Sequence, residues 1–245
     1  MAERTVGLLH PGEMGAAVGA VLRGRGHRVV WASEGRSVET RARAEAAGLE
    51  DVGTAAEVAR SEIVFSICPP HAALEVAGSA RFGGVYVDAN AVSPATAAKV
   101  ADAVDEFVDG GIVGSPPREA GTTRLYLSGE RAAEVAELFA GSALDARVVS
   151  NASAVKMAYA AWSKGTAAML LAIRELARRE GVEETLLAEW DISLPELRER
   201  YERAERSAEA KGWRWVGEME EIAATFEAAG LPPGFHQAAA EVFRR

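Results

Sequence analysis

The stretch from Val6 to Arg25, VGLLHPGEMGAAVGAVLRGR, decides the fold. It begins as an apolar run, turns through HPGEMG and continues with small residues that favour a helix. A strand, a glycine turn and a helix in this order open a dinucleotide-binding unit, in which the helix N-terminus attracts the pyrophosphate. On the spacing Gly-x-Gly-x-x-Gly, Gly12 and Gly15 hold the second and third positions, and His10 stands at the first. The stretch therefore predicts a nucleotide site, with an ordinary strand-to-helix turn as the alternative.

Composition limits the classes of protein to which the chain belongs. Its 245 residues fit one large domain or two smaller ones, and 49% hydrophobic residues provide for a sizeable core. A net charge of -9 argues against nucleic acid as a partner but leaves room for a local site for a small anionic cofactor. The single cysteine, Cys68, excludes an internal disulfide and suits a reducing compartment. Since the sequence has no signal peptide, membrane span or metal-ligand spacing, we expect a cytoplasmic protein without membrane or metal partners.

Short apolar runs alternate with helical patterns up to about residue 150. We expect strands at 6–9, 28–32, 62–68, 85–88, 107–109, 124–128 and 146–149, and helices at 16–22, 38–47, 55–60, 72–77, 95–104 and 132–139. Continuous apolar strands separated by helices are typical of a mostly parallel sheet that is covered on both faces. The class predicted for residues 1–150 is therefore α/β, with a Rossmann-type doubly wound sheet.

No strand pattern remains after Asn151, and residues 151–245 are expected to form a smaller all-α domain. A helix is predicted from about 152 to 180, broken at Gly165, with further helices at 183–189, 194–211, 216–229 and 237–244. The long helix is too apolar to be solvated on all sides and must bury a stripe. Since the later helices are rich in charge, we expect a second copy of the chain to cover this stripe, in a homodimer formed through the helical domain.

Ligands of an open parallel sheet lie beyond the carboxyl ends of its strands. Five segments occupy those ends: 10–15, 32–37, 68–71, 88–93 and 109–117. At the second strand end a carboxylate would hold the ribose of NAD, and an arginine would accommodate the 2′-phosphate of NADP. Ser33 and Arg36 favour NADP, with NAD possible. The alternative is a helix cap at Ser37 beside a solvated Arg36.

Lys156 is the candidate for proton transfer. It lies in the first turns of the long helix among apolar neighbours, with Tyr159 on the same helical face. Partial desolvation lowers the pKa of an ammonium toward the range that is useful in general acid–base catalysis. The alternative is a lysine whose stem is buried and whose charge stays in solvent.

Four segments together resemble the β-hydroxyacid dehydrogenase and 6-phosphogluconate dehydrogenase superfamily, in particular its small members with a short helical C-terminal domain. They are GLLHPGEMGAAVGAVLRGRGHRVVWASEGRS, SICPPHAALEVA, DANAVSPATAAKVADAV with FVDGGIVGSPP, and SAVKMAYAAWSKGTAAML. The tail GWRWVGEMEEIAATFEAAGLPPGF is similar as well. The resemblance implies a Rossmann domain, a long interdomain helix, an interlocked homodimer, and NAD(P)-dependent oxidation of a hydroxy acid or the reverse reduction.

The resemblance also implies roles for individual residues. The cofactor residues would be His10, Pro11, Gly12, Glu13, Met14 and Gly15 at the pyrophosphate, Ser33, Arg36 and Ser37 at the selective end, and Cys68, Pro69, Pro70 and Asn90 near the nicotinamide ribose. The substrate residues would be Asn90, Ser93, Val113, Gly114 and Tyr159, with Lys156 as the catalytic acid and base.

Three departures from the family pattern concern the substrate side. One is the Ser-Gly-Gly turn of the family, which here reads Val113-Gly114-Ser115. Asn90 stands where the family has a substrate serine, and Tyr159 and Ala160 stand where an asparagine usually follows the lysine by one helical turn. The primary hypothesis is an NADP-dependent dehydrogenase or reductase for a small hydroxy or oxo acid. The alternative is a protein that binds NADP without turnover, as a sensor or an assembly partner.

Overall fold

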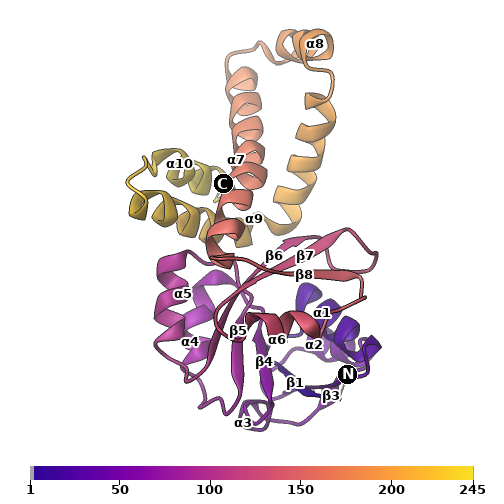
Figure 1. Cartoon of the computed structure of the whole chain (residues 1–245). Helices are drawn as coiled ribbons and strands as arrows, with labels where there is room; N and C mark the ends of the chain where they lie inside the picture. Colours follow the sequence, from indigo (N-terminus) through magenta and orange to yellow (C-terminus); the bar gives the residue numbers. More distant parts are fainter. Residues whose placement is uncertain (1–2, 245) are drawn as a thin grey trace. The chain divides into compact units, whose positions relative to one another are not determined.

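A computed structural model describes residues 3–244 of the protein (Figure 1). The chain forms two compact units, the first ending at Lys156 and the second beginning at Met157. The first unit holds a sheet with helices, and the second is entirely helical where it is described. The predicted fold class, a mostly parallel Rossmann-type sheet followed by a smaller all-α part, is confirmed.

The sheet of the first unit has eight strands in the order β3-β2-β1-β4-β5-β6-β7-β8. The strands are β1 (Thr5–Leu8), β2 (Arg28–Trp31), β3 (Glu50–Asp51), β4 (Ile63–Ser66), β5 (Val85–Asp88), β6 (Phe107–Gly114), β7 (Thr123–Ser128) and β8 (Leu144–Val148). All neighbouring pairs are parallel except β6 with β7. The order reverses direction at β1 and β4, which places a switch point, the usual position of a ligand, beside the turn after β1.

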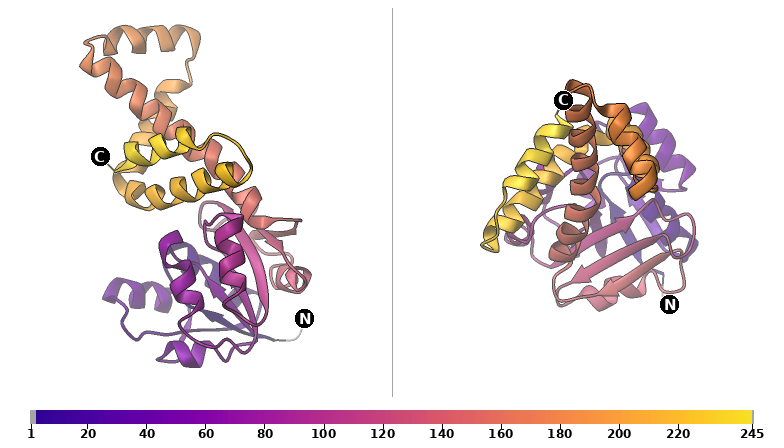
Figure 2. Two further views of the ribbon diagram at one scale, coloured as in Figure 1. Left: turned by 90° about the vertical axis from the view of Figure 1, so that its left-hand side faces the viewer. Right: turned by 90° about the horizontal axis from the view of Figure 1, so that it is seen from above.

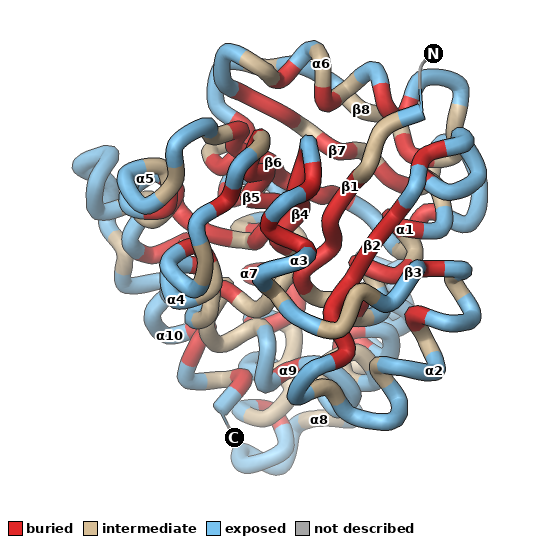
Figure 3. The backbone as a smooth tube through the Cα atoms, turned by 90° about the horizontal axis from the view of Figure 1, so that it is seen from below, coloured by how far each residue is buried: buried red, intermediate tan, exposed pale blue. Residues whose placement is uncertain are grey.

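Helices cover both faces of this sheet. They are α1 (Glu13–Gly24), α2 (Val38–Ala46), α3 (Ala55–Val58), the 3-10 turn η1 (Pro70–Ala72), α4 (Ala73–Ala77), α5 (Pro94–Ala101) and α6 (Ala132–Glu137). One apolar core joins the strands to α1, α2 and α6, and a second core joins them to α3, α4 and α5. Figure 3 shows β2, β4 and β5 buried along most of their length while the outer side of α2 is exposed.

Two strands differ from the sequence prediction. The short edge strand β3 was not predicted, because its two residues, Glu50 and Asp51, are charged and exposed. Strand β6 continues to Gly114, whereas the sequence places its end at Asp109 and a loop over 109–117. Gly110 and Gly111 suggested a loop, but a Cβ on Gly110 would lie 2.9 Å from the Asp88 carbonyl oxygen. The glycines allow close packing within a strand.

The second unit is built from long helices. Helix α7 (Ala152–Arg179) begins in the first unit and continues into the second, and α8 (Glu183–Ser193) connects it to α9 (Leu197–Ala228). Helix α10 (Gly234–Phe243) runs beside the C-terminal half of α9 (Figure 2). Within residues 3–244, no helix combines the length and the apolar character that crossing a membrane requires.

Two predicted helix interruptions were wrong. Helix α7 is continuous through Gly165, where an added Cβ would lie 3.1 Å from the Phe235 ring, so this glycine allows α10 to approach. Helix α9 is continuous where two helices were predicted on either side of residues 212–215. Its buried side keeps a helical spacing from Tyr201 to Ala223, and Trp215 packs edge-on against Phe243 with ring centroids 5.0 Å apart. Packing on one face outweighs the weak helix propensity of glycine.

We expect Phe65→Ala to destabilise the first unit by about 3–5 kcal/mol, as removal of a buried aromatic ring usually does. The Phe65 side chain is fully buried in β4, and its ring meets that of Phe139 edge to face at 5.9 Å. Urea unfolding followed by circular dichroism measures the change. Val38→Ala, at a position that is 77% exposed, is the control and should stay within about 0.5 kcal/mol of the unmodified chain. Equal stabilities of the two variants would contradict the assignment of this core.

Candidate functional site

The turn after β1 forms an uncapped helix N-terminus. Among the residues that the structure describes, no side chain caps α1 at Gly12, and a Cβ on Gly12 would meet nothing within 4 Å. Gly15, one turn away, is crowded instead, since its Cβ would lie 2.2 Å from the His10 carbonyl oxygen. One glycine thus keeps the helix end open to a ligand, and the other lets the helix pack against the turn. These are the roles that the second and third glycines have in a pyrophosphate loop.

His10 replaces the first glycine and brings a neutral ring to the turn. Burial, with the nearby Arg36 charge, lowers the pKa of His10 to about 4. Its Nδ1 is buried and has no hydrogen-bond partner among residues 3–244. The imidazole therefore carries no charge near pH 7 and keeps one polar atom unsatisfied.

Arg36 reaches from the end of β2 to the same turn. Its guanidinium donates to the Leu9 carbonyl oxygen at 3.2 Å, and its Nε is buried without a partner in the described chain. The alternative of a solvated Arg36 is therefore wrong. The other half of that alternative is confirmed, since Ser37 caps α2 by accepting from the Thr40 amide at 3.3 Å.

Three further residues at this end of the sheet were not predicted. Arg41 donates to the Ser33 carbonyl oxygen at 2.8 Å, and Arg43 donates to the Pro11 carbonyl oxygen at 3.3 Å. Asp51 accepts from the Ser33 and Gly53 amides, and hydrogen bonding from Ser33 holds the pKa of this carboxyl below its usual value. Arg41 and Arg43 lie on α2, which directly follows this strand end, so the sequence could have indicated them. Only the pairing of β3 with β2 brings Asp51 to Ser33.

Asn90 connects the ends of β4 and β5. Its side-chain oxygen accepts from the Cys68 amide, and its side-chain nitrogen donates to Ser66 Oγ at 3.1 Å and to Asp88. Asn90 is 2% exposed, so its amide group is committed to partners inside the chain. It fixes the start of the Cys68-Pro69-Pro70 turn, and burial raises the pKa of the Cys68 thiol to about 11. That thiol is consequently protonated at neutral pH.

The other predicted substrate residues lie at three different elements: α5, β6 and α7. Ser93 is buried and caps α5 by accepting from the Thr96 amide at 3.2 Å. Val113 and Gly114 lie on β6, paired with Arg124 and Thr123, and not in the predicted loop. The strand continues there because it pairs with β7 from Asp109 to Gly114. Tyr159 is half exposed on α7 in the second unit.

Lys156 lies against β6. Its Nζ donates to the Ile112 carbonyl oxygen at 2.8 Å, so its charge does not simply end in solvent. A Cβ on Gly111 would lie 2.8 Å from Lys156 Cβ and 2.9 Å from the Ala152 carbonyl oxygen. Strand β6 extends past the last residue of β5, which pairs with Asp109. The lysine ammonium is therefore held on the part of β6 that projects beyond the carboxyl end of β5.

The described residues of the first unit fit a dinucleotide. The open face of Gly12, the uncapped α1 and the unpartnered Arg36 Nε suit the phosphate oxygens of an anionic cofactor. Among the described residues, no group of three or more His, Cys, Asp and Glu side chains is arranged to hold a metal ion.

Comparisons with known proteins agree with this geometry. Residues 177–245 match the model of a domain of unknown function, DUF1932. An uncharacterized 28.5 kDa protein in the 7S RNA 5′ region of Methanothermus fervidus is 33% identical over 165 residues, and the match spans 63% of each protein. A solved conserved protein of unknown function, described as structurally similar to 3-hydroxyacid dehydrogenases, is 29% identical with a TM-score of 0.70. That match covers 98% of this chain and 95% of the other.

Two more distant structures share the fold. The 3-hydroxyisobutyrate dehydrogenase of Mycobacterium tuberculosis with L-serine is 20% identical, with a TM-score of 0.68 over 99% of this chain and 93% of the other. A reductive aminase of Aspergillus terreus in complex with NADPH is 16% identical, with a TM-score of 0.61 over 100% and 93%. Together with the glycine turn and the lysine on α7, these likenesses confirm that the chain resembles the β-hydroxyacid dehydrogenase and 6-phosphogluconate dehydrogenase-like superfamily.

Proposed function

We propose that the protein is an NADP-dependent oxidoreductase that transfers a hydride between nicotinamide and a small hydroxy or oxo acid. The observation that carries the proposal is that the uncapped end of α1 and the unpartnered Nε of Arg36 meet at the turn after β1, to which the Arg36–Leu9 hydrogen bond brings the guanidinium. A pyrophosphate suits the first feature and a 2′-phosphate the second. When bound, the nicotinamide supplies or accepts the hydride. The NADPH-bound reductive aminase of the same fold supports this choice of cofactor.

Lys156 is proposed as the general acid and base. An ammonium held by the Ile112 carbonyl oxygen is a proton donor, so during reduction it gives a proton to the carbonyl oxygen of the oxo acid. During oxidation the neutral amine takes the proton from the hydroxyl. The 3-hydroxyisobutyrate dehydrogenase of similar fold supports a small hydroxy acid as the substrate class. Substrate contacts by Asn90, Ser93, Val113, Gly114 and Tyr159 stay predictions.

We also propose that the chain works as a homodimer through its helical unit. Large apolar side chains recur on α7 at a spacing of three, four or seven residues and are at least 37% exposed: Tyr159, Trp162, Met169, Ile173 and Leu176. Such a stripe is typical of a helix that packs against another helix, and an exposed apolar surface of this extent marks an interface.

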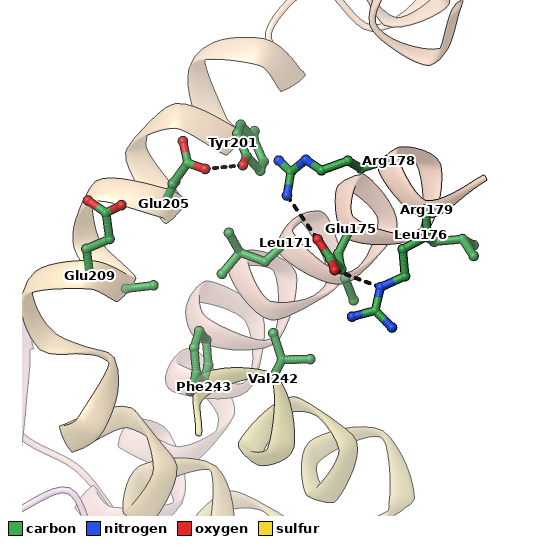
Figure 4. A pocket seen from close by; sticks show the side chains of 12 residues that line it. Leu171, Glu175, Leu176, Arg178, Arg179, Tyr201, Glu205, Glu209, Val242 and Phe243 are labelled. Atoms are coloured by element: carbon green, nitrogen blue, oxygen red, sulfur yellow. Dashed lines mark hydrogen bonds and ion pairs between the residues drawn. The ribbon is translucent and has the colours of Figure 1, made fainter. Parts of the chain in front are cut away.

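A groove of about 620 Å³ lies beside the stripe in the same unit, between α7, α9 and α10 (Figure 4). Leu171, Leu176 and Phe243 line it, while Glu175 pairs with Arg178 and Arg179 at its edge. An apolar floor with a rim of paired charges suits a helix of a second copy. This protein is proposed as its own partner, and no nucleic acid or membrane partner is proposed.

Titration calorimetry and turnover assays test the cofactor and the lysine together. We expect NADPH to bind more tightly than NADH, and Arg36→Ser to weaken NADPH binding about 10–100-fold, the effect of one charge-assisted hydrogen bond, with little change for NADH.

Lys156→Met should bind NADPH normally and lose turnover by about 10²–10⁴, the usual contribution of a general acid. Oxo acids, aldehydes and imines form the substrate panel.

Each part of this prediction has its own contrary outcome. NADPH binding without turnover on any panel member would favour the alternative of a cofactor-binding protein without catalysis. If titration calorimetry gives no heat of binding with either NADPH or NADH, the proposal of a nucleotide site is wrong. Unchanged turnover of Lys156→Met on an accepted substrate would remove the lysine from the mechanism.

The neutral state of His10 predicts how stability depends on pH. The pKa of His10 is 6.5 in the unfolded chain and about 4 in the folded chain, so the unfolded chain takes up the proton at the higher pH. Stability should therefore fall as the pH drops from 7 toward 4, and this fall should be smaller in His10→Gln. Urea unfolding at several pH values measures it, with His71→Gln at an exposed histidine as the control. Parallel pH profiles for the unmodified chain and His10→Gln would refute the assignment.

Sedimentation analysis tests the dimer. We expect twice the chain mass of 25.9 kDa for the unmodified protein. The double variant Trp162→Glu, Ile173→Glu places charges within the α7 stripe and should sediment as a monomer, since each anchor of an interface contributes about 2 kcal/mol or more. Val38→Glu, at an exposed position in α2, should leave the mass unchanged. A monomeric unmodified chain at micromolar concentration would rule the dimer out.

A further inference from the structure

Asp109 is a buried carboxylate that the proposed chemistry does not use. It lies on β6 opposite Ser128 of β7, and both residues are less than 10% exposed. Asp109 accepts from Ser128 Oγ at 3.1 Å, from the Ser153 amide at 2.8 Å and from Ser153 Oγ. A carboxylate removed from water needs such donors, and here the helix N-terminus of α7 supplies two of the three.

These bonds fasten the first turn of α7 to two strands. The Ala152 amide donates to Ser128 Oγ at 2.9 Å, next to the bond from the Ser153 amide to Asp109. A separate cap satisfies the following amide, because Ala154 donates to Asn151 Oδ1 at 2.8 Å. Asn151 is exposed and Asp109 is buried. The helix thus has an ordinary cap at the surface and a second anchor that fixes it to the sheet.

Lys156 lies next to the second anchor on the same two elements. Ser153 and Lys156 are three residues apart, so they share one helical face. Asp109 and Gly111 are two residues apart on β6, so they share one face of the sheet. Along the same two elements, the Ser153–Asp109 bonds are therefore followed by the close approach of Lys156 to Gly111, where an added Cβ would meet Lys156 Cβ. A shift of α7 along β6 would break both, together with the bond from Lys156 Nζ to Ile112.

We propose that Asp109 is a positioning residue for Lys156: its carboxylate sets the register of α7 on β6 and so holds the ammonium at the Ile112 carbonyl. The inference depends on the proposed function only for the catalytic role of the lysine. The placement itself is a property of the chain without cofactor or substrate, and it is measurable in that state.

Competitive acetylation of the amines, read by peptide mass spectrometry across a range of pH, measures the environment of Lys156. Lys99 on α5 provides the internal reference. In Asp109→Asn, where one acceptor oxygen becomes a donor, we expect Lys156 to react about tenfold faster relative to Lys99, the effect of losing one charge-assisted hydrogen bond, with a changed pH midpoint. Ser153→Ala should act in the same direction and less strongly. Asn151→Ala, which removes only the surface cap, should leave Lys156 unchanged.

The outcomes separate positioning from general support of the fold. Lower thermal stability of Asp109→Asn and Ser153→Ala with unaltered Lys156 labelling would overturn the proposal. If Asp109→Asn does not fold, the comparison of Ser153→Ala with Asn151→Ala decides. With an accepted substrate, Asp109→Asn alone should lower kcat relative to the unmodified chain. The double variant Asp109→Asn, Lys156→Met should have the same kcat as Lys156→Met, since Asp109 acts through the lysine. Altered labelling combined with full turnover of Lys156→Met would refute the proposed function and leave the positioning role intact.

Discussion

Buried polar side chains cross four neighbouring strands in register, and the site depends on how they are satisfied. Ser66, Asp88, Asp109 and Ser128 are paired from β4 to β7, and each is less than 10% exposed. Carboxylates at such depth are stable only when donors surround them. Asn90 supplies donors to Asp88 while it holds the Cys68 amide, and Ser153 supplies donors to Asp109. The same hydrogen bonds that stabilise the carboxylates therefore place the Cys68 turn and helix α7.

Much of the fold could be predicted from the sequence because apolar runs and glycine turns are local signals. The order of strand and helix, the pyrophosphate turn at Gly12 and Gly15 and the position of Lys156 on a long helix all come from such patterns. The row of polar residues across the sheet was not predicted, since it depends on the register of strands about 20 residues apart. For the same reason the hydrogen bonds of the Asn90 amide to Cys68, Ser66 and Asp88 could not be predicted from the sequence.

Glycines caused the errors in the predicted element boundaries of β6 and α7, because glycine has two structural roles. It ends an element where the backbone needs a positive φ, as at Gly181 after α7. It also allows two backbones to approach within an element, as at Gly111 under Lys156 and Gly165 beside Phe235. A sequence does not distinguish these uses, since both depend on what lies opposite. The predicted loop at 109–117 and the predicted break in α7 were errors of this one kind.

The acidic character of the chain and its proposed anion site are compatible because charges act locally. A net charge of -9 concerns the whole surface, yet ions screen exposed charges beyond about 8 Å at physiological salt. Around the turn after β1, three arginines donate hydrogen bonds to main-chain carbonyl oxygens. The pairs are Arg36 with Leu9, Arg43 with Pro11 and Arg41 with Ser33. His10 stays neutral beside them, so it adds no repulsion among the cations. The nearby carboxylate of Asp51 accepts hydrogen bonds from the Ser33 and Gly53 amides. A phosphate at this turn would therefore meet a local excess of positive charge, whatever the charge of the remaining surface.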